Sequence, residues 1–402
     1  MKIKFSNSKR FLIFLLGLLS AIGPFSIDMY LPGFTYIAED LGTSIDRVQL
    51  SLTSFFIGIA FGQLIYGPIM DRFGRKKPLM IGLFIYILSS VLCAVAINVE
   101  ALIALRFTQA LGSCAGMVAA RAMVRDFFKP YETANVMSLL MLVIGISPII
   151  APTLGSLMIQ LGDWHYIFYV LAGIGITIAL LVHFFLKGAK GADQTISLRP
   201  KYVMEQYQQV ISLKQFIIFA LAGGFAASGM YAYLSGSPFV LMELYAFTEA
   251  QYGWAFAMLA SGLIIAAQLN SLVLRYYDSL TIARWASFSQ LIVGLSLVIV
   301  GVMDIQNVYL LLGLLFLYLF FQGFVFPNTS AMSLNPFKRL AGSASALMGF
   351  LQLFIGAITS MVVSVFHNGT QAPMGITMGV VTALGFIILW SYRPKVLLED
   401  VY

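Results

Sequence analysis

Charged residues are scarce in this sequence. Only 10% of its 402 residues are Asp, Glu, Lys or Arg, whereas 60% are hydrophobic types. An average soluble domain is about a quarter charged and about half apolar. Because so few polar groups could not cover the surface of a soluble fold, the composition excludes a soluble enzyme and a disordered protein. The mean hydropathy of +0.90 agrees, and we expect a membrane protein with little mass outside the bilayer.

Residues that carry catalytic or metal chemistry are also few. The two cysteines, Cys93 and Cys114, lie in apolar segments, which argues against a disulfide scaffold and a cysteine metal site. The three histidines, His165, His183 and His367, lie in different segments without metal-ligand spacing. The sequence shows no Gly-rich phosphate loop and no serine-nucleophile motif. We therefore expect no metal, no cofactor and no enzymatic activity.

What the sequence holds instead is a series of long apolar runs. A spanning helix needs roughly 20 apolar residues, so 402 residues with short connections allow about twelve spans. The prediction is an all-α polytopic membrane protein with twelve transmembrane helices. The predicted segments are residues 11–36, 48–70, 78–97, 101–124, 132–160, 164–186, 213–240, 250–273, 281–302, 306–329, 340–366 and 373–392.

The basic residues predict the orientation of these helices. All but two of the 24 Lys and Arg residues lie before the first segment, in every second loop or at the helix ends beside those loops, or at the carboxyl end. The exceptions are Arg47 and Arg106, and the acidic residues show no such bias. Since Lys and Arg concentrate on the cytoplasmic side, we expect both ends of the chain in the cytoplasm. This distribution also argues against a nucleic-acid partner, although the net charge is +7.

A weak internal repeat indicates two halves. A shift of 203 residues places Tyr30-Leu-Pro-Gly33 on Tyr233-Leu-Ser-Gly236, and the second apolar segment on the eighth. Such an offset indicates a parallel duplication about an axis along the membrane normal. We therefore predict a six-helix bundle over residues 1–186, a cytoplasmic linker loop over 187–212 and a second six-helix bundle over 213–402.

The sharpest local motif follows the second apolar segment. Residues 67–77 read Gly-Pro-Ile-Met-Asp-Arg-Phe-Gly-Arg-Lys-Lys. This stretch resembles the G-x-x-x-D-R-x-G-R-[RK] signature of the major facilitator superfamily, in its expected place between helices 2 and 3. The resemblance implies alternating access by two bundles, with the loop acting in a cytoplasmic gate that closes against neighbouring helix ends. The implied gate residues are Gly67, Asp71, Arg72, Gly74, Arg75 and Lys76, with Arg121, Arg125 and Asp126 as candidate partners.

A second motif places a cation inside the fourth segment. Arg106 near the bilayer centre would cost roughly 2.5–3.5 kcal/mol, so it must face protein or a water-filled cavity. The alternative is that it snorkels to the outer interface. Arg106, Gln109, Ser113 and Met117 share one face at helical spacing. The segment resembles the R-x-x-Q-G motif of the same superfamily, with Ala110 in place of the glycine.

Asp28 is the one acid within an apolar span, and it lies between Pro24 and Pro32. Intramembrane carboxyls are rare and usually functional. The prolines interrupt the backbone hydrogen bonds nearby and favour a cavity lining. We expect Asp28 to exchange protons, with Arg106 biasing that exchange electrostatically. The alternative is that Asp28 lies in the outer interface and caps a loop.

The fifth segment holds two prolines four residues apart among small residues. Prolines kink a helix, and small residues permit close packing. The stretch resembles the antiporter motif G-x-x-x-G-P-x-x-G-G of drug exporters, although Ala151 and Ser156 replace two glycines. An ordinary kinked packing helix is the alternative. The motif positions are Gly145, Pro148, Pro152 and Gly155.

Three stretches resemble one branch of the superfamily, the Bcr/CflA branch of bicyclomycin and chloramphenicol resistance proteins. They are Asp28-Met-Tyr-Leu-Pro32, the Arg106 segment that ends in residues 121–126, and Ser235-Gly-Ser-Pro-Phe-Val240. In the second half, Pro327-Asn328 and residues 341–346 resemble this branch too. The resemblance implies a proton-coupled antiporter for multidrug efflux in the bacterial inner membrane, with the proton as coupling ion. We expect a monomer whose partners are a small-molecule substrate and the lipid bilayer.

Two other functions stay open at this point. The same scaffold could export a native metabolite, such as a siderophore or an amino acid, or could be a membrane receptor that does not transport. Under the transport hypotheses, we expect a central substrate cavity. The residues expected to line it are Asp28, Tyr30, Arg106, Gln109, Ser113, Met117, Tyr231, Tyr233 and Gln322.

Overall fold

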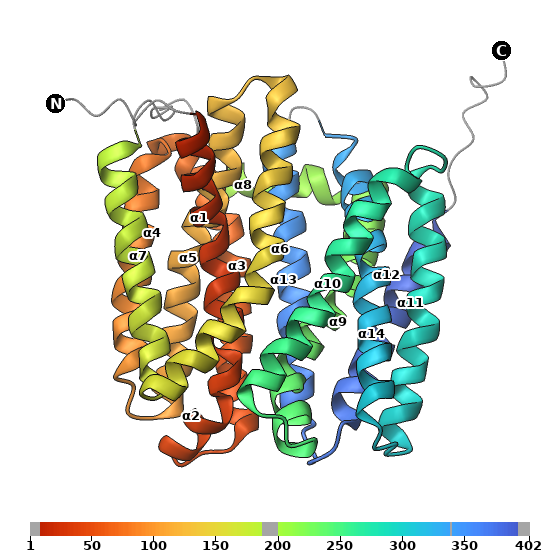
Figure 1. Ribbon diagram of the computed structural model, residues 1–402. Coiled ribbons are helices and arrows are strands. Elements are labelled where there is room, and N and C mark those ends of the chain that lie inside the picture. Colours follow the sequence, from red (N-terminus) through yellow and green to blue (C-terminus); the bar gives the residue numbers. More distant parts are fainter. Residues whose placement is uncertain (1–8, 187–199, 338–339, 393–402) are drawn as a thin grey trace.

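The computed structural model describes residues 9–186, 200–337 and 340–392, and every regular element in these ranges is helical. Twelve stretches of helix are long and apolar enough to cross a membrane, which confirms the predicted polytopic all-α fold. The helices stand side by side, and α1 begins at the same end of the bundle at which α14 ends (Figure 1). We call this end the terminal face and the other end the opposite face. That the terminal face is cytoplasmic stays a prediction.

Eight spanning or short helices of the described residues precede residue 187 and pack mainly on one another. Close pairs are α3 with α5, α4 with α5 and α7, and α1 with α5 and α6. Their bounds are α1 Lys9–Asp28, η2 Leu31–Gly33, α2 Phe34–Asp40, α3 Ile45–Phe73, α4 Lys76–Ala94, α5 Val99–Phe127, α6 Pro130–Leu161 and α7 His165–Phe185.

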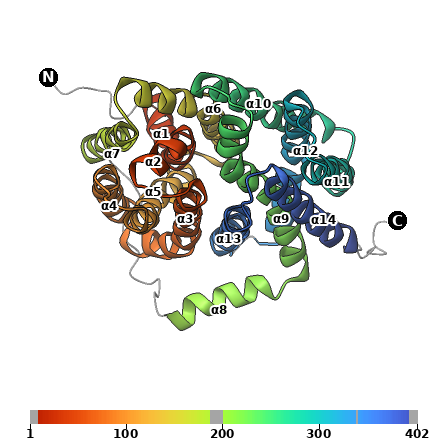
Figure 2. The same ribbon diagram turned by 90° about the horizontal axis from the view of Figure 1, so that it is seen from below.

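The remaining spanning helices form a second group, seen beside the first along the helix axes (Figure 2). Here α9 packs on α12, α13 and α14, and α11 packs on α12 and α14. Their bounds are α9 Lys214–Pro238, η3 Phe239–Leu244, α10 Glu249–Val273, α11 Ser279–Val302, α12 Val308–Leu334, α13 Ala341–Val365 and α14 Ala372–Ser391. The groups meet along two seams, α3 against α13 and α6 against α10. The predicted units 1–186 and 213–402 stay a prediction about folding and motion.

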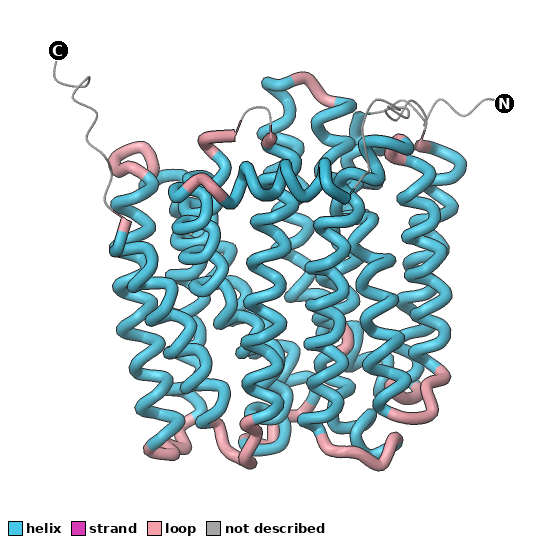
Figure 3. Tube along the Cα trace, turned by 180° about the vertical axis from the view of Figure 1, so that it is seen from behind, coloured by secondary structure: helices cyan, strands magenta, loops and turns pink. Residues whose placement is uncertain are grey.

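The predicted linker loop contains a helix. α8 spans Pro200–Ile211, runs across the spanning helices near the terminal face (Figure 3) and passes along the edge of both groups (Figure 2). Val203, Tyr207 and Val210 recur at helical spacing and pack on a cluster with Phe216 and Leu347. The sequence predicted a loop here because the polar residues on the outward face of this helix lower the mean hydropathy of the stretch. The rest of the predicted linker up to residue 199 lies outside the described residues.

Local sequence explains where several helices begin and end. Asn98 accepts a hydrogen bond from the Ala101 amide at 2.8 Å and caps α5, and Asp278 caps α11 through the Leu280 and Thr281 amides at 3.0 Å. Gly74 ends α3 with φ of +80°, a backbone conformation that side chains disfavour. This turn lets the chain reverse directly into α4.

Candidate functional site

The first helix ends inside the bundle. Pro24 lies within α1, and the chain passes from Asp28 into the short helix η2 before α2 begins. The last carbonyls of a helix lack partners within that helix. The carbonyl oxygens of Phe25 and Ile27 accept hydrogen bonds from the amides of Met29 and Tyr30. The carbonyl oxygen of Ser26 requires a donor from another part of the protein.

Arg106 supplies that donor. Its Nη2 donates to the Ser26 carbonyl oxygen at 3.0 Å, and its Nη1 donates to Gln109 Oε1 at 2.6 Å. The guanidinium also lies 4.5 Å from the ring centre of Tyr30 and 4.2 Å from that of Phe55. The side chain is fully buried. A cation at a helix carboxyl terminus and over aromatic rings is electrostatically stabilised, so Arg106 is held by neutral groups.

Asp28 occupies the last residue of α1 and is only 3% exposed. Within the described ranges it forms no hydrogen bond and no ion pair, and Arg106 bonds the backbone beside it instead. Its carboxyl lies near enough to Tyr233 and Tyr252 of the second helix group for charges on these side chains to influence one another, although no hydrogen bond joins them. The structure thus places Asp28 near the second helix group, and its carboxyl forms no ion pair with Arg106, whose electrostatic influence on proton exchange stays a prediction.

Several buried polar atoms around the interior have no hydrogen-bond partner in the described part of the chain. They include the Tyr233 hydroxyl, Arg106 Nε, Gln322 Oε1 and both side-chain polar atoms of Gln49. Buried polar atoms in proteins are nearly always satisfied, so each such atom calls for water or a ligand. These groups come from α3, α5, α9 and α12, helices of both groups.

The other predicted cavity residues are packed against protein. Tyr30 bonds Ser51 at 2.7 Å, and Gln109 donates to Ser90 at 2.8 Å. Ser113 donates to a carbonyl of its own helix. Of the remaining predicted cavity residues, Met117 lies beside Gly23, and Tyr231 packs edge-on to Phe56 with ring centres 4.7 Å apart. Gln322 lies near the carbonyl of Ala227.

The opposite face is closed by hydrogen bonds between the two groups. Thr35 of α2 donates to Glu243 Oε1 at 2.9 Å, and Tyr36 donates to Glu249. Ser156 of α6 donates to the Glu249 backbone carbonyl at 3.2 Å. These contacts lie at the ends of helices, where α2 and α6 meet η3 and α10.

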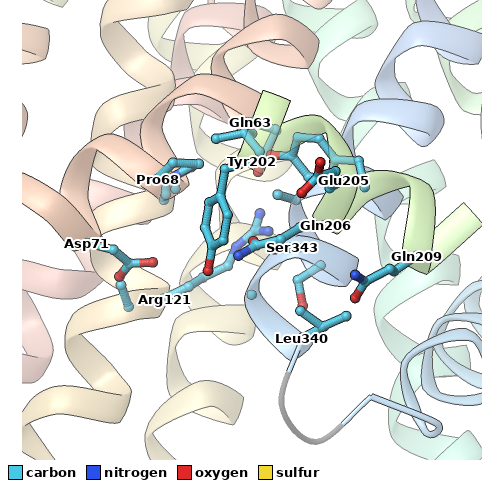
Figure 4. A pocket seen from close by; sticks show the side chains of 18 of the residues that line it. Gln63, Pro68, Asp71, Arg121, Tyr202, Glu205, Gln206, Gln209, Leu340 and Ser343 are labelled. Atoms are coloured by element: carbon cyan, nitrogen blue, oxygen red, sulfur yellow. Dashed lines mark hydrogen bonds between the residues drawn. The ribbon is translucent and has the colours of Figure 1, made fainter. Parts of the chain in front are cut away.

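A cavity of about 670 Å³ opens instead at the terminal face, between α3, α5, α8 and α13 (Figure 4). Polar groups from both sides line it, among them Gln63, Asp71, Arg121, Gln206 and Ser343. None of the nine residues predicted for the substrate cavity lines it. Those nine lie deeper in the bundle or behind packed helices, so their role in binding stays a prediction.

The gate motif lies beside this cavity. Arg75 is 6% exposed and pairs with Asp126 at 2.8 Å and with Asp71 at 2.5 Å. Burial of the guanidinium alone would lower the pKa of Arg75, but the hydrogen bonds to Asp126 and Asp71 outweigh it and raise that pKa. Lys76 donates to the last carbonyls of α7, those of His183 and Leu186, at 2.8 and 3.1 Å.

Two of the remaining gate residues, Arg72 and Gly67, lie close to this network. The guanidinium of Arg72 lies 5.9 Å from the Phe73 ring centre, and Gly67 lines the cavity. Arg121 lines the cavity from α5 and forms no hydrogen bond or ion pair in the described ranges. The side chain of Arg125 lies outside the part that the structure describes.

The predicted antiporter motif lies on α6, which continues through Pro148 and Pro152. At Gly155 this helix touches the backbone of Met29, the residue after Asp28, so closely that no side chain fits between them. At Gly145 the helix faces Ile264 of α10 at ordinary distance. The motif therefore lies at the contact between α6 and the end of α1.

Comparison with known proteins identifies the family. The model of the Major Facilitator Superfamily matches residues 16–361. The chain belongs to the major facilitator superfamily. It is 35% identical to an uncharacterized MFS-type transporter, YdgK, of Bacillus subtilis, with 96% of each chain covered. It is 32% identical to a bicyclomycin resistance protein homolog of Haemophilus influenzae, with 95% of this chain and 97% of that one covered.

A solved structure shows the same fold at low sequence identity. A bacterial homolog of the human lysosomal transporter Spinster matches with a TM-score of 0.67 at 14% identity, covering 97% of this chain and 96% of that one. The chain is thus a polytopic membrane transporter of this superfamily, as its 67–77 motif indicated.

Sequence reasoning missed several residues that shape the two faces. Gln63, Tyr207 and Ser343 line the cavity, and Glu243 and Glu249 close the opposite face. The two glutamates are acids near the ends of apolar segments, a signal that could have been used. For Gln63 and Ser343 no local pattern in the sequence separates them from other polar residues of spanning helices.

Proposed function

We propose that the chain is a proton-coupled exporter of amphipathic small molecules in the bacterial inner membrane, working as a monomer with its terminal face in the cytoplasm. The observation that carries this proposal is Asp28, a buried acid without a cation partner at the meeting of the two helix groups. The relative named for bicyclomycin resistance supports export of a drug-like cargo.

The geometry supports loading from the cytoplasm in this conformation. The cavity opens at the terminal face, where nearly all predicted loop cations lie, and the opposite face is held shut by Thr35, Tyr36 and Ser156. Rocking of the two groups would close the first face and open the second. The two seams between the groups, α3 with α13 and α6 with α10, would serve as the surfaces that move.

Asp28 would carry the coupling proton. Ionising a carboxyl inside a bundle is costly unless water or a polar partner reaches it. Proton release from Asp28 would therefore depend on what occupies the space near Tyr233 and Tyr252. Arg106 would act as a positioning residue, since it holds the carbonyl of Ser26 and with it the last turn of α1.

One proton supplies enough energy for useful export. One elementary charge moving through ~100 mV is worth about 2.3 kcal/mol. Since about 1.4 kcal/mol corresponds to a tenfold concentration ratio, a single proton supports a cargo concentration ratio across the membrane on the order of fifty-fold.

Reconstituted protein with an imposed pH gradient provides the test. Bicyclomycin uptake into proteoliposomes, with a pH indicator inside, would be compared between wild type and Asp28→Asn. The matched control is Asp304→Asn, which changes an exposed acid in the loop between α11 and α12. We expect gradient-driven uptake and proton counterflow in wild type and the control, and neither in Asp28→Asn. Uphill transport by Asp28→Asn at the wild-type rate would exclude the coupling role.

A further inference from the structure

The cavity at the terminal face contains an uncompensated cation. Four ionisable acids and bases line it: Asp71, Arg75, Arg121 and Glu205. Arg75 is paired with both Asp71 and Asp126, so these three residues together carry a net charge of −1. Arg121 has no hydrogen bond or ion pair among the described residues, and Glu205 is an exposed residue of α8 at the edge of the cavity. Apart from the Arg75 triad, the charged groups that line the cavity are thus the half-buried Arg121 and the solvated Glu205.

Among the described residues, the guanidinium of Arg121 has no hydrogen-bond or ion-pair partner. Behind it lies a small space walled mainly by apolar side chains, those of Met117, Met137, Leu140 and Ile144. Figure 4 shows Arg121 and Asp71 on one side of the cavity and Gln206, Gln209 and Ser343 on the other. A charge removed from bulk water without a partner is costly, so Arg121 favours an anion or water in the cavity.

We propose that this cavity binds amphipathic anions, with a carboxylate or a similar oxyanion on Arg121 and the apolar part against the cavity walls. A guanidinium presents paired donors that match a carboxylate in two parallel hydrogen bonds. The neutral groups of Gln63, Gln206 and Ser343 supply further hydrogen bonds without adding charge. The volume of about 670 Å³ falls within the range of small-molecule sites.

This inference rests on the proposed function, because it names the class of cargo that the exporter would admit from the terminal face. It adds a charge preference that Asp28 alone does not imply. An anion at Arg121 would enter the transport path before it reaches the level of Asp28. The gate residues Asp71 and Arg75 would stay paired with each other during this step.

The test is equilibrium binding of two probes that differ only in charge. N-dansyl-leucine is an anion at pH 7, and N-dansyl-leucinamide is its neutral counterpart with the same ring and side chain. Each would be titrated by fluorescence against the purified full chain in phosphatidylcholine nanodiscs at about 0.1 M salt. Charge-assisted hydrogen bonds are roughly twice as strong as neutral ones, so we expect the anion to bind at least about tenfold more tightly in wild type.

Four variants separate a charge effect from a folding effect. Arg121→Gln should bind both probes equally, whereas Arg121→Lys should keep part of the preference as a point charge. Glu205→Gln should increase the preference, because it removes the unpaired anion at the cavity edge. Arg275→Gln, which removes an exposed arginine just beyond α10, is the matched control and should behave as wild type.

Three outcomes would overturn the inference: equal affinity for the two probes in wild type, a preference that persists in Arg121→Gln, and binding of neither probe. The titration needs no proton gradient, so it can succeed where the transport assay on Asp28 fails. Conversely, gradient-driven bicyclomycin uptake without a preference between the dansyl probes would leave the proposed function standing and remove this inference.

Discussion

The contact between α6 and the end of α1 yields a prediction for Gly155→Ala. A Cβ atom added at Gly155 would overlap the carbonyl oxygen of Met29 and lie 3.0 Å from its carbonyl carbon. These are backbone atoms, which cannot rotate away as a flexible side chain can. Since Met29 follows Asp28, any shift that relieves the overlap also displaces the carboxyl that we propose for coupling.

The size of the effect follows from the distances. Carbon atoms make ordinary contacts at about 3.5–4.0 Å, so α6 and α1 would have to separate by roughly 0.5–1 Å. Overpacking a close contact costs about 1–3 kcal/mol. Replacing glycine by alanine inside a helix stabilises the folded state by about 0.5–1 kcal/mol through the higher helix propensity of alanine. We therefore expect Gly155→Ala to be destabilised by about 1–2 kcal/mol.

Gly145→Ala is the matched control on the same helix. Its added Cβ atom would lie 3.4 Å from the side chain of Ile264, which is an ordinary contact. This variant should keep only the helix-propensity gain and be as stable as wild type or slightly more stable. Thermal unfolding followed by tryptophan fluorescence in detergent measures both variants. Equal midpoints for Gly155→Ala and Gly145→Ala would refute the reasoning from the Met29 contact.

Two further predictions concern the opposite face and a helix cap. Tyr36→Phe removes the hydrogen bond to Glu249 across the two groups, worth about 1 kcal/mol, and should favour opening of the opposite face by about fivefold. The assay places a cysteine at the buried Ser237 in a protein whose Cys93 and Cys114 have been replaced, and measures its alkylation rate. Faster alkylation in Tyr36→Phe would show more frequent opening of the opposite face, and an unchanged rate would contradict the prediction. Asp278→Ala should lose about 1 kcal/mol by uncapping α11, while Asp278→Asn should retain most of it, as thermal unfolding would show. Hydrogen bonds from Thr281 lower the pKa of Asp278. The stabilisation by this cap should therefore be complete above the ordinary pKa of aspartate, and it should be lost only as the pH falls through the lowered pKa. A loss of stability already near neutral pH would contradict the cap.

The membrane-spanning part of the fold could be predicted because the bilayer imposes a simple rule. A helix that crosses hydrocarbon needs about 20 apolar residues, and all twelve candidate spans overlap the predicted segments. The same rule did not predict α8, because a helix of twelve residues that does not cross the membrane needs only one apolar face. The spacing of Val203, Tyr207 and Val210 carried that information, but an average over the whole stretch conceals it.

The site was harder to predict, because its partners are set by tertiary contacts. The sequence singled out Asp28 and Arg106 as ionisable residues within apolar segments. It could not show that Arg106 bonds the carbonyl of Ser26, since that requires α1 to end inside the bundle beside α5. The cavity is likewise a property of one conformation, and its lining combines α3, α5, α8 and α13.

The aromatic pair Phe56 and Tyr231 forms a contact between the two helix groups. On α3, Phe56 lies seven residues before Gln63, about 10 Å deeper from the cavity at the terminal face. On α9, Tyr231 lies two residues nearer that face than Tyr233, which lies near Asp28. The two rings meet edge-on at 4.7 Å from opposite helix groups. If the proposed function holds, separation of this pair would be one of the movements that open a path from the cavity at Arg121 toward Asp28, which makes the contact between Phe56 and Tyr231 a place where loading and proton release could be connected.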